Sequence, residues 1–135
     1  GSAMPASIET VTKGLHGTLM TISGKRMVEI SVEIMANIGK KVCATYGIQP
    51  NDVDILIPHQ ANYIIMKGVA NAMGIDIEKM EVSIDTAANT ISGTLPITLH
   101  QAITKNKLQP GKLVLFVTAA SGYAGGAAIY KVPAA

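Results

Sequence analysis

The chain has 135 residues, which suits one domain, and 48% of them are hydrophobic while only 15% are charged, so a sizeable core can form. The net charge of +2 comes from lysines and arginines that form no basic stripe, which argues against a nucleic-acid partner. Cys43 is the single cysteine, which excludes an intramolecular disulfide and a cysteine-based metal site and is compatible with a reducing compartment.

The sequence shows no membrane or targeting segment. No run approaches the roughly 20 apolar residues that a membrane span needs, and no signal-peptide pattern is present. We therefore expect a cytoplasmic protein without membrane association. Residues 1–15, beginning GSAM, are interpreted as a cloning remnant and a lead-in, so the natural chain is expected to extend further upstream. The domain itself is expected to span residues 16–135.

Segments with strand composition alternate along the chain with segments of helical periodicity. The predicted strands are residues 16–23, 54–58, 80–85, 112–120 and 126–132. The predicted helices are residues 25–46, 62–73 and 90–106. This alternation predicts an α/β fold with a five-stranded mixed sheet, mostly parallel, and flanking helices. The last strand should be antiparallel, because the last two strands are joined too tightly for a crossover.

The predicted helix at residues 90–106 is unusual in composition. It contains Gly93 and Pro96, and Pro96 lies either in the first turn of a helix that starts late or at a kink. Its apolar side chains leave no clean polar face before Gln101; they are Ile91, Leu95, Ile97, Leu99 and Ile103. A helix that is apolar almost all round must be covered all round, so the sequence predicts a partner on its far side.

Polar groups follow three of the predicted strands. His59 comes directly after the apolar run ending at Pro58, Asn89 follows the strand at 80–85, and the glycine-rich stretch 120–126 follows the next strand. Because the working groups of a parallel sheet gather at the carboxyl ends of its strands, these groups should share one edge. An imidazole and a carboxamide can both donate to one developing oxyanion, and a glycine turn brings backbone N–H groups close to a ligand.

Structural explanations also exist for each of these residues. A lone histidine after a strand is more often structural than catalytic, an asparagine before a helix is often an N-cap, and the glycine stretch can be a hairpin turn. We interpret His16 and His100 as structural, and Cys43 as an inert core residue, because no basic group or helix N-terminus is expected near its thiol. The convergence of three groups on one edge favours a site.

Three motifs carry a resemblance to a known family. They are DVDILIPHQAN, DTAANTISGTLP and LQPGKLVLFVTAASGYAGGAAIYKV, and the likeness runs from about His16 to Val132. The chain resembles the C-terminal half of β-ketoacyl-ACP synthase III, a condensing enzyme of the thiolase superfamily. The resemblance implies a thiolase-like half-domain that packs face to face with an N-terminal half of the same enzyme, with the helix at 90–106 between the two sheets.

The resemblance also implies site residues and partners. His59 and Asn89 would hold the thioester carbonyl of a malonyl extender during decarboxylative Claisen condensation, and Gln60, Asn62 and Gly122 would contact the substrate. The substrates would be acyl-CoA and malonyl-acyl carrier protein, with no cofactor and no metal, and the enzyme would be a homodimer. The acyl-accepting cysteine would come from the N-terminal half, so this chain alone is predicted to be inactive.

The sequence departs from the family pattern at two places. Ala120 replaces an aromatic residue before the glycine turn, and Ile64, Asn71 and Ala72 replace basic residues expected to meet the carrier protein. Coenzyme A thioesters, another extender and acyl transfer to a non-carbon nucleophile therefore remain open. The alternative class of function is a non-catalytic half-domain that binds a partner.

Overall fold

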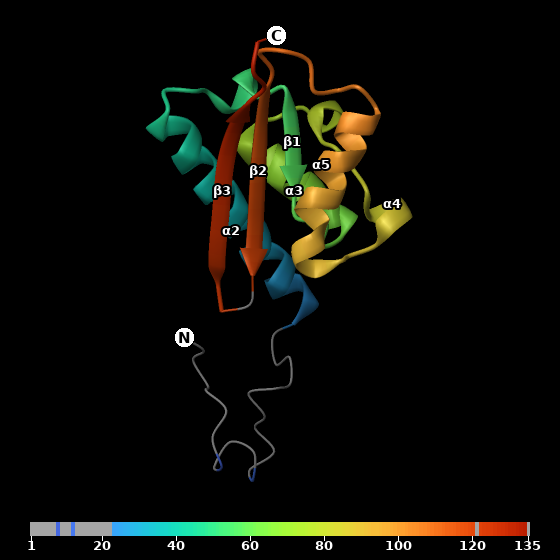
Figure 1. The fold of residues 1–135 in the computed structure, drawn as a ribbon. Coiled ribbons are helices and arrows are strands. Elements are labelled where there is room, and N and C mark those ends of the chain that lie inside the picture. The colour runs from blue at the N-terminus through green and yellow to red at the C-terminus, as the bar shows by residue number, and fades with distance from the viewer. Residues whose placement is uncertain (1–7, 9–11, 13–22, 121, 135) are drawn as a thin grey trace.

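The computed structural model describes residues 8, 12, 23–120 and 122–134 (Figure 1). Residues 16–22 of the first predicted strand and His16 lie outside the described residues. Among those that are described, no helix combines the length and the apolar character needed to cross a bilayer.

The first long helix, α2, spans Gly24–Thr45 and confirms the helix predicted at 25–46. It begins at Ser23, whose side-chain oxygen accepts a hydrogen bond from the Arg26 backbone N–H, and it ends before Tyr46 and the left-handed Gly47. Met35, Ala36, Gly39 and Cys43 form its buried face, which turns the amphipathic pattern of the sequence into packing.

Three strands form one mixed sheet in the order β1-β2-β3. Strand β1 spans Ile55–Pro58, β2 spans Leu113–Ala120 and β3 spans Ala124–Lys131. Strands β1 and β2 are parallel, with Pro58 opposite Val117, whereas β2 and β3 are antiparallel, as predicted for the last pair. All four residues of β1 are buried, because helices cover it on both sides.

The predicted five-stranded sheet is wrong for the described residues, which form three strands. The segment at 80–85 makes only one isolated bridge, between Met80 and Leu56, with a hydrogen bond from the Glu81 N–H to the Leu56 carbonyl. The chain then leaves the sheet, because the Ser83 N–H bonds to the Gln60 side chain instead of a strand carbonyl. A short helix, α4, follows at Ile84–Ala87.

Two further helices flank β1. Helix α3 spans Tyr63–Met73, which confirms the helix predicted at 62–73, and ends at Gly74, whose φ of 71° forms a left-handed cap. Helix α5 spans Thr94–Thr104 after a 3-10 turn at Ile91–Gly93. Pro96 thus lies in the first turn of a helix that starts late, which is one of the two arrangements expected for it.

The sheet separates two apolar clusters, because alternate strand residues point to opposite faces. On one face, Leu56, Leu115 and Val117 pack against α2 and α3 in the main core. On the other, Ile55, Ile57 and Val114 pack against Leu95 and Leu99 of α5. Figure 1 shows α5 beside β1, away from α2.

Helix α2 approaches the sheet closely because glycines line the contact. A Cβ atom added to Gly39 would lie 2.7 Å from the Met73 Cε, and one added to Gly125 would lie 2.5 Å from the Ile34 Cγ2. Neither distance is tolerable without a shift of the helix or of its neighbours. The two glycines therefore set how near α2 lies to α3 and to β3.

The outer side of α5 is apolar and uncovered by the described residues. Ile97 is 38% exposed and Ile103 is 54% exposed, whereas the polar Thr94 and Thr98 are buried. This helix therefore shows the reverse of the usual pattern for a helix between a core and water.

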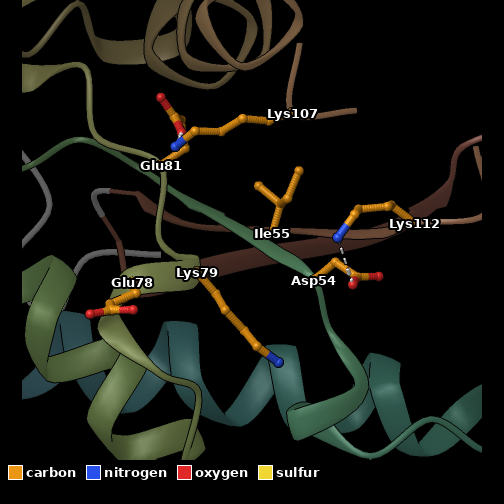
Figure 2. A pocket seen from close by; sticks show the side chains of 7 residues that line it. All are labelled: Asp54, Ile55, Glu78, Lys79, Glu81, Lys107 and Lys112. Atoms are coloured by element: carbon orange, nitrogen blue, oxygen red, sulfur yellow. Dashed lines mark hydrogen bonds and ion pairs between the residues drawn. The ribbon is translucent and has the colours of Figure 1, made fainter. Parts of the chain in front are cut away.

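Charged groups gather in a cleft of about 290 Å³ near the start of β1 (Figure 2). Glu81 is 1% exposed, and its two carboxylate oxygens accept hydrogen bonds from the Nζ atoms of Lys105 and Lys107, at 2.7 and 2.6 Å. Burial alone would raise the pKa of Glu81, but the hydrogen bonds and charges of the two lysines outweigh it, and the pKa lies below its ordinary value of 4.5.

We expect Glu81→Gln to lower the free energy of unfolding at pH 7 by about 1.5 to 3 kcal/mol, the range for hydrogen bonds to charged groups. A carboxyl whose pKa is lowered by folding stabilises the protein above its unfolded pKa and loses this effect as pH falls through the folded value. The difference between wild type and variant should therefore shrink below about pH 4.5. Urea unfolding of wild type and variant at several pH values measures this difference in stability, and Glu78→Gln, at an exposed position, is the control. A difference that stays constant down to pH 2 would contradict the lowered pKa of Glu81.

Candidate functional site

His59 lies directly after β1 at the carboxyl end of the parallel pair. Its backbone N–H donates to the Val117 carbonyl at 2.8 Å, which continues the ladder one residue past Pro58 and fixes where the imidazole begins. The ring is partly buried, and its Nδ1 lies 2.7 Å from the Thr94 Oγ1. Burial lowers the pKa of His59 from 6.5, so the ring is neutral at pH 7.

Asn89 follows α4 and is exposed. Its Oδ1 accepts a hydrogen bond from the Ile91 backbone N–H at 2.9 Å, so Asn89 closes a local turn, whereas the N-cap of the 3-10 turn that follows is Thr90. This bond also fixes which end of the amide is free. The Nδ2 group has no acceptor among the described residues and can donate to a ligand.

Two residues, Ile91 and Thr94, link the two predicted site residues. The Ile91 N–H bonds to Asn89, and the Ile91 carbonyl accepts a hydrogen bond from the Thr94 Oγ1 at 3.0 Å. Thr94 in turn contacts His59. The carboxamide and the imidazole are therefore joined by a continuous path of three hydrogen bonds.

The backbone on both sides of Asn89 is strained. Ala88 has φ 55° and ψ −167°, a region that favours glycine, and Ile91 has φ 56° although its side chain is β-branched. Such residues cost of order 1–3 kcal/mol each, and they cluster at functional sites. Hydrogen bonds to the N–H and to the carbonyl group of Ile91 keep the backbone in this strained conformation.

A buried network of polar side chains holds the hydrogen-bonded path between Asn89 and His59 in place. The Gln60 side chain is completely buried; its Nε2 donates to the Pro58 carbonyl at 2.8 Å and its Oε1 accepts from the Ser83 N–H at 2.9 Å. The Ser83 Oγ lies 2.6 Å from the Thr98 Oγ1, which donates to the Thr94 carbonyl. Gln60 was predicted to contact substrate, but its position favours a structural role.

The other two predicted substrate contacts lie near the same edge of the sheet. Asn62 is the N-cap of α3, with its Oδ1 accepting from the Ile65 N–H at 2.9 Å, and it is exposed. Gly122 follows the carboxyl end of β2 and has φ 83°, so this turn requires a residue that tolerates the left-handed region. Among the residues that the structure describes, no hydrogen bond joins either residue to His59 or Asn89.

Three residues of this network were not predicted from the sequence: Thr94, Thr98 and Ser83. Two threonines four residues apart on an otherwise apolar helix were the available signal, because that spacing places both side chains on one face. The thiol of Cys43 is buried and free, and its pKa is raised by burial and by the charge of Asp52, as expected of an inert core residue. Among the described residues, no group of three or more metal-ligating side chains could hold an ion.

The chain is similar to known proteins in sequence. Residues 43–132 match the family model for the 3-oxoacyl-[acyl-carrier-protein (ACP)] synthase III C terminal. The chain is 35% identical over 127 residues to β-ketoacyl-[acyl-carrier-protein] synthase III of Symbiobacterium thermophilum, covering 94% of this chain and 38% of that protein. It is 33% identical to the enzyme of the same name from Solibacter usitatus, covering 97% of this chain and 39% of that protein.

Solved structures show the same fold. The 3-oxoacyl-[acyl-carrier-protein] synthase III of Aquifex aeolicus matches with a TM-score of 0.78 and 32% identity, over 82% of this chain and 36% of that chain. The corresponding Pseudomonas aeruginosa structure matches with a TM-score of 0.80 and 24% identity, over 96% of this chain and 40% of that chain. The chain spans about two fifths of the length of these relatives. It belongs to the thiolase-like C-terminal domain family of β-ketoacyl-ACP synthase III.

Proposed function

We propose that this chain is the C-terminal half of a condensing enzyme that joins acyl thioesters, with acyl-CoA and malonyl-acyl carrier protein as substrates and a cytoplasmic location. The observation that carries the proposal is the hydrogen-bonded path from Asn89 through Ile91 and Thr94 to His59. It ties a carboxamide and an imidazole together at the edge of the sheet where a substrate would approach. The family match and the strained backbone support the same conclusion.

In this reaction the extender thioester loses CO₂ and becomes an enolate. The enolate carbon then attacks an acyl thioester on a cysteine, so that a C–C bond forms and the C–S bond breaks. The Asn89 Nδ2 group, and the His59 Nε2 when it carries a proton, would donate to the oxygen on which negative charge develops. The cysteine would belong to the N-terminal half, because Cys43 is buried and its pKa is raised.

The exposed surface of α3 bears on which acyl carrier the enzyme would use. Ile64, Asn71 and Ala72 are exposed on α3, where the family pattern has basic residues, so this surface offers little attraction for an acidic carrier protein. A coenzyme A thioester or a non-carbon acyl acceptor would fit the same His59 and Asn89. If the chain is instead a non-catalytic, partner-binding half-domain, substitutions of His59 and Asn89 should not affect its function.

In the full-length protein, His59→Ala and Asn89→Ala should each abolish most condensation while acyl loading of the distant cysteine continues. Each loss should correspond to about 2.7 to 4 kcal/mol of barrier, as for other oxyanion donors. The double variant should be little worse than the worse single one, because the two groups act on one oxygen. Single-turnover assays of loading and condensation measure this, with exposed Asn37→Ala as the control; unchanged condensation would favour the binding module.

This chain alone should not become acylated. Acyl transfer needs a thiolate, and the Cys43 thiol is buried with a raised pKa. We expect no added mass when the chain is incubated with an acyl-CoA and studied by intact-mass spectrometry. A stoichiometric acyl adduct that disappears in Cys43→Ser would overturn the expectation.

The isolated chain should associate through α5, because Ile97 and Ile103 leave an apolar surface that the other half of the enzyme would cover. A twofold dimer of this chain would bury that surface in a self-complementary contact. Light scattering should show a dimer for the wild type and a monomer for Ile97→Lys, since an unpaired charge in an apolar contact is costly. Ile64→Lys, on the exposed face of α3, is the matched control and should remain dimeric.

A further inference from the structure

Ile91 lies next to a predicted site residue in a backbone conformation that isoleucine rarely adopts. Its φ of 56° is in the left-handed region, where a β-branched side chain is an outlier. The Ile91 N–H donates to the Asn89 Oδ1 at 2.9 Å, and the Ile91 carbonyl accepts from the Thr94 N–H. These hydrogen bonds hold the backbone in place, but they do not involve the Ile91 side chain.

The side chain of Ile91 does not stabilise the fold of the described residues through burial. It is 78% exposed and belongs to neither of the two apolar clusters on the faces of the sheet. Glycine, which has no Cβ atom, would adopt the same φ without strain and would make the same backbone hydrogen bonds. Asparagine also tolerates this region. Local folding therefore favours glycine or asparagine over isoleucine at this position.

Backbone strain is concentrated near the carboxyl ends of the strands. Four non-glycine residues with positive φ are found among those that the structure describes. Ala88 and Ile91 flank Asn89, and a third, Tyr123, lies in the turn between β2 and β3. The fourth, Asn106, follows the other end of α5 and is of a type that tolerates this conformation. Strain of this kind clusters at binding and active sites, so a role of the Ile91 side chain in binding would account for its cost.

We propose that Ile91 is a specificity-determining residue whose side chain contacts the apolar carbons beside the thioester carbonyl of the extender. This proposal deepens the proposed function and rests on it, because the Asn89 Nδ2 would hold that carbonyl oxygen. The Ile91 N–H fixes the opposite end of the same amide, so the residue that orients Asn89 also presents its side chain beside it. Apolar carbons come from two sources, the acyl part of the extender and the arm of the carrier beyond the sulfur.

The N-terminal half of the enzyme is the other candidate to cover this side chain. Ile91 differs from Ile97 and Ile103, which that half would cover, because it precedes α5 and its backbone is bonded to a site residue. The two occupants predict opposite changes in stability. Loss of a side chain buried between the halves would destabilise the enzyme, whereas glycine in place of a strained residue that serves only the substrate would not.

Steady-state condensation by the full-length protein, with malonyl-acyl carrier protein as the extender, tests the contact. Ile91→Gly and Ile91→Asn should each raise the KM for the extender on the order of 10-fold, the lower end of the range for a small apolar group lost from a pocket. The kcat should change little, because the contact would exist in the bound substrate and in the transition state alike. Ile91→Leu keeps an apolar side chain and should remain close to wild type. An unchanged KM in the glycine and asparagine variants, or a loss confined to kcat, would overturn the proposal.

Urea unfolding of the same full-length variants separates the two occupants. The midpoint for Ile91→Gly should be at least as high as that of wild type. Asn106→Gly is the matched control, because it also places glycine at a positive φ but beyond the other end of α5, and its KM should match wild type. A midpoint lowered by Ile91→Gly would assign the side chain to the contact between the halves and overturn the proposal.

Calorimetric binding of malonyl- and methylmalonyl-acyl carrier protein distinguishes the source of the carbons and separates this proposal from the proposed function. A larger loss of affinity in Ile91→Gly for the methylmalonyl form supports contact with the acyl part, and equal losses support contact with the carrier arm. If the protein catalyses no condensation but Ile91→Gly weakens binding about 10-fold, the proposed function fails and the contact stands. If condensation occurs while Ile91→Gly changes neither the Kd nor the KM, the contact alone fails.

Discussion

The candidate site depends on one buried amide. Gln60 stands at the end of β1 and bonds to the Pro58 carbonyl behind it and to the Ser83 N–H across from it. The Gln60 side chain thus makes the hydrogen bond that a neighbouring strand would make in a sheet. It also holds the segment that leads into α4 and Asn89. With no exposed surface, this amide cannot exchange its partners for water, so the geometry above it is rigid.

The orientation of helix α5 brings polar side chains to that site and leaves apolar side chains exposed. Its threonines at 94 and 98 turn inward to meet His59 and Ser83, and this rotation points isoleucines 97 and 103 outward. A helix that faced water would place these residues the other way round. The same orientation of α5 therefore accounts for both the proposed site and the proposed cover by the other half of the enzyme.

The sequence predicted the elements whose periodicity comes from burial, and it failed where a side chain replaced backbone pairing. Helices α2 and α3 and strands β1, β2 and β3 follow the predicted ranges within a few residues, because their apolar spacing is set by the core. The strand at 80–85 was wrong because Gln60, 23 residues earlier in the chain, takes the Ser83 N–H. Pro58 located His59 correctly at a strand end, whereas the spacing of two threonines in an apolar helix is a weaker signal, so Thr94 was missed.

The distribution of charge suits a site that works by hydrogen bonding. The buried carboxylate, Glu81, is directed toward the lysines of the cleft near the start of β1, whereas the described groups on the path at the other end are His59, Thr94 and the Asn89 amide, all neutral at pH 7. Burial lowers the pKa of His59, and no neighbouring carboxylate raises it. A fixed negative charge beside His59 would favour its protonated form and would repel a developing oxyanion. In the proposed reaction, a carboxylate kept at the far end of the strand would leave the imidazole and the amide free to act on the substrate without that competition.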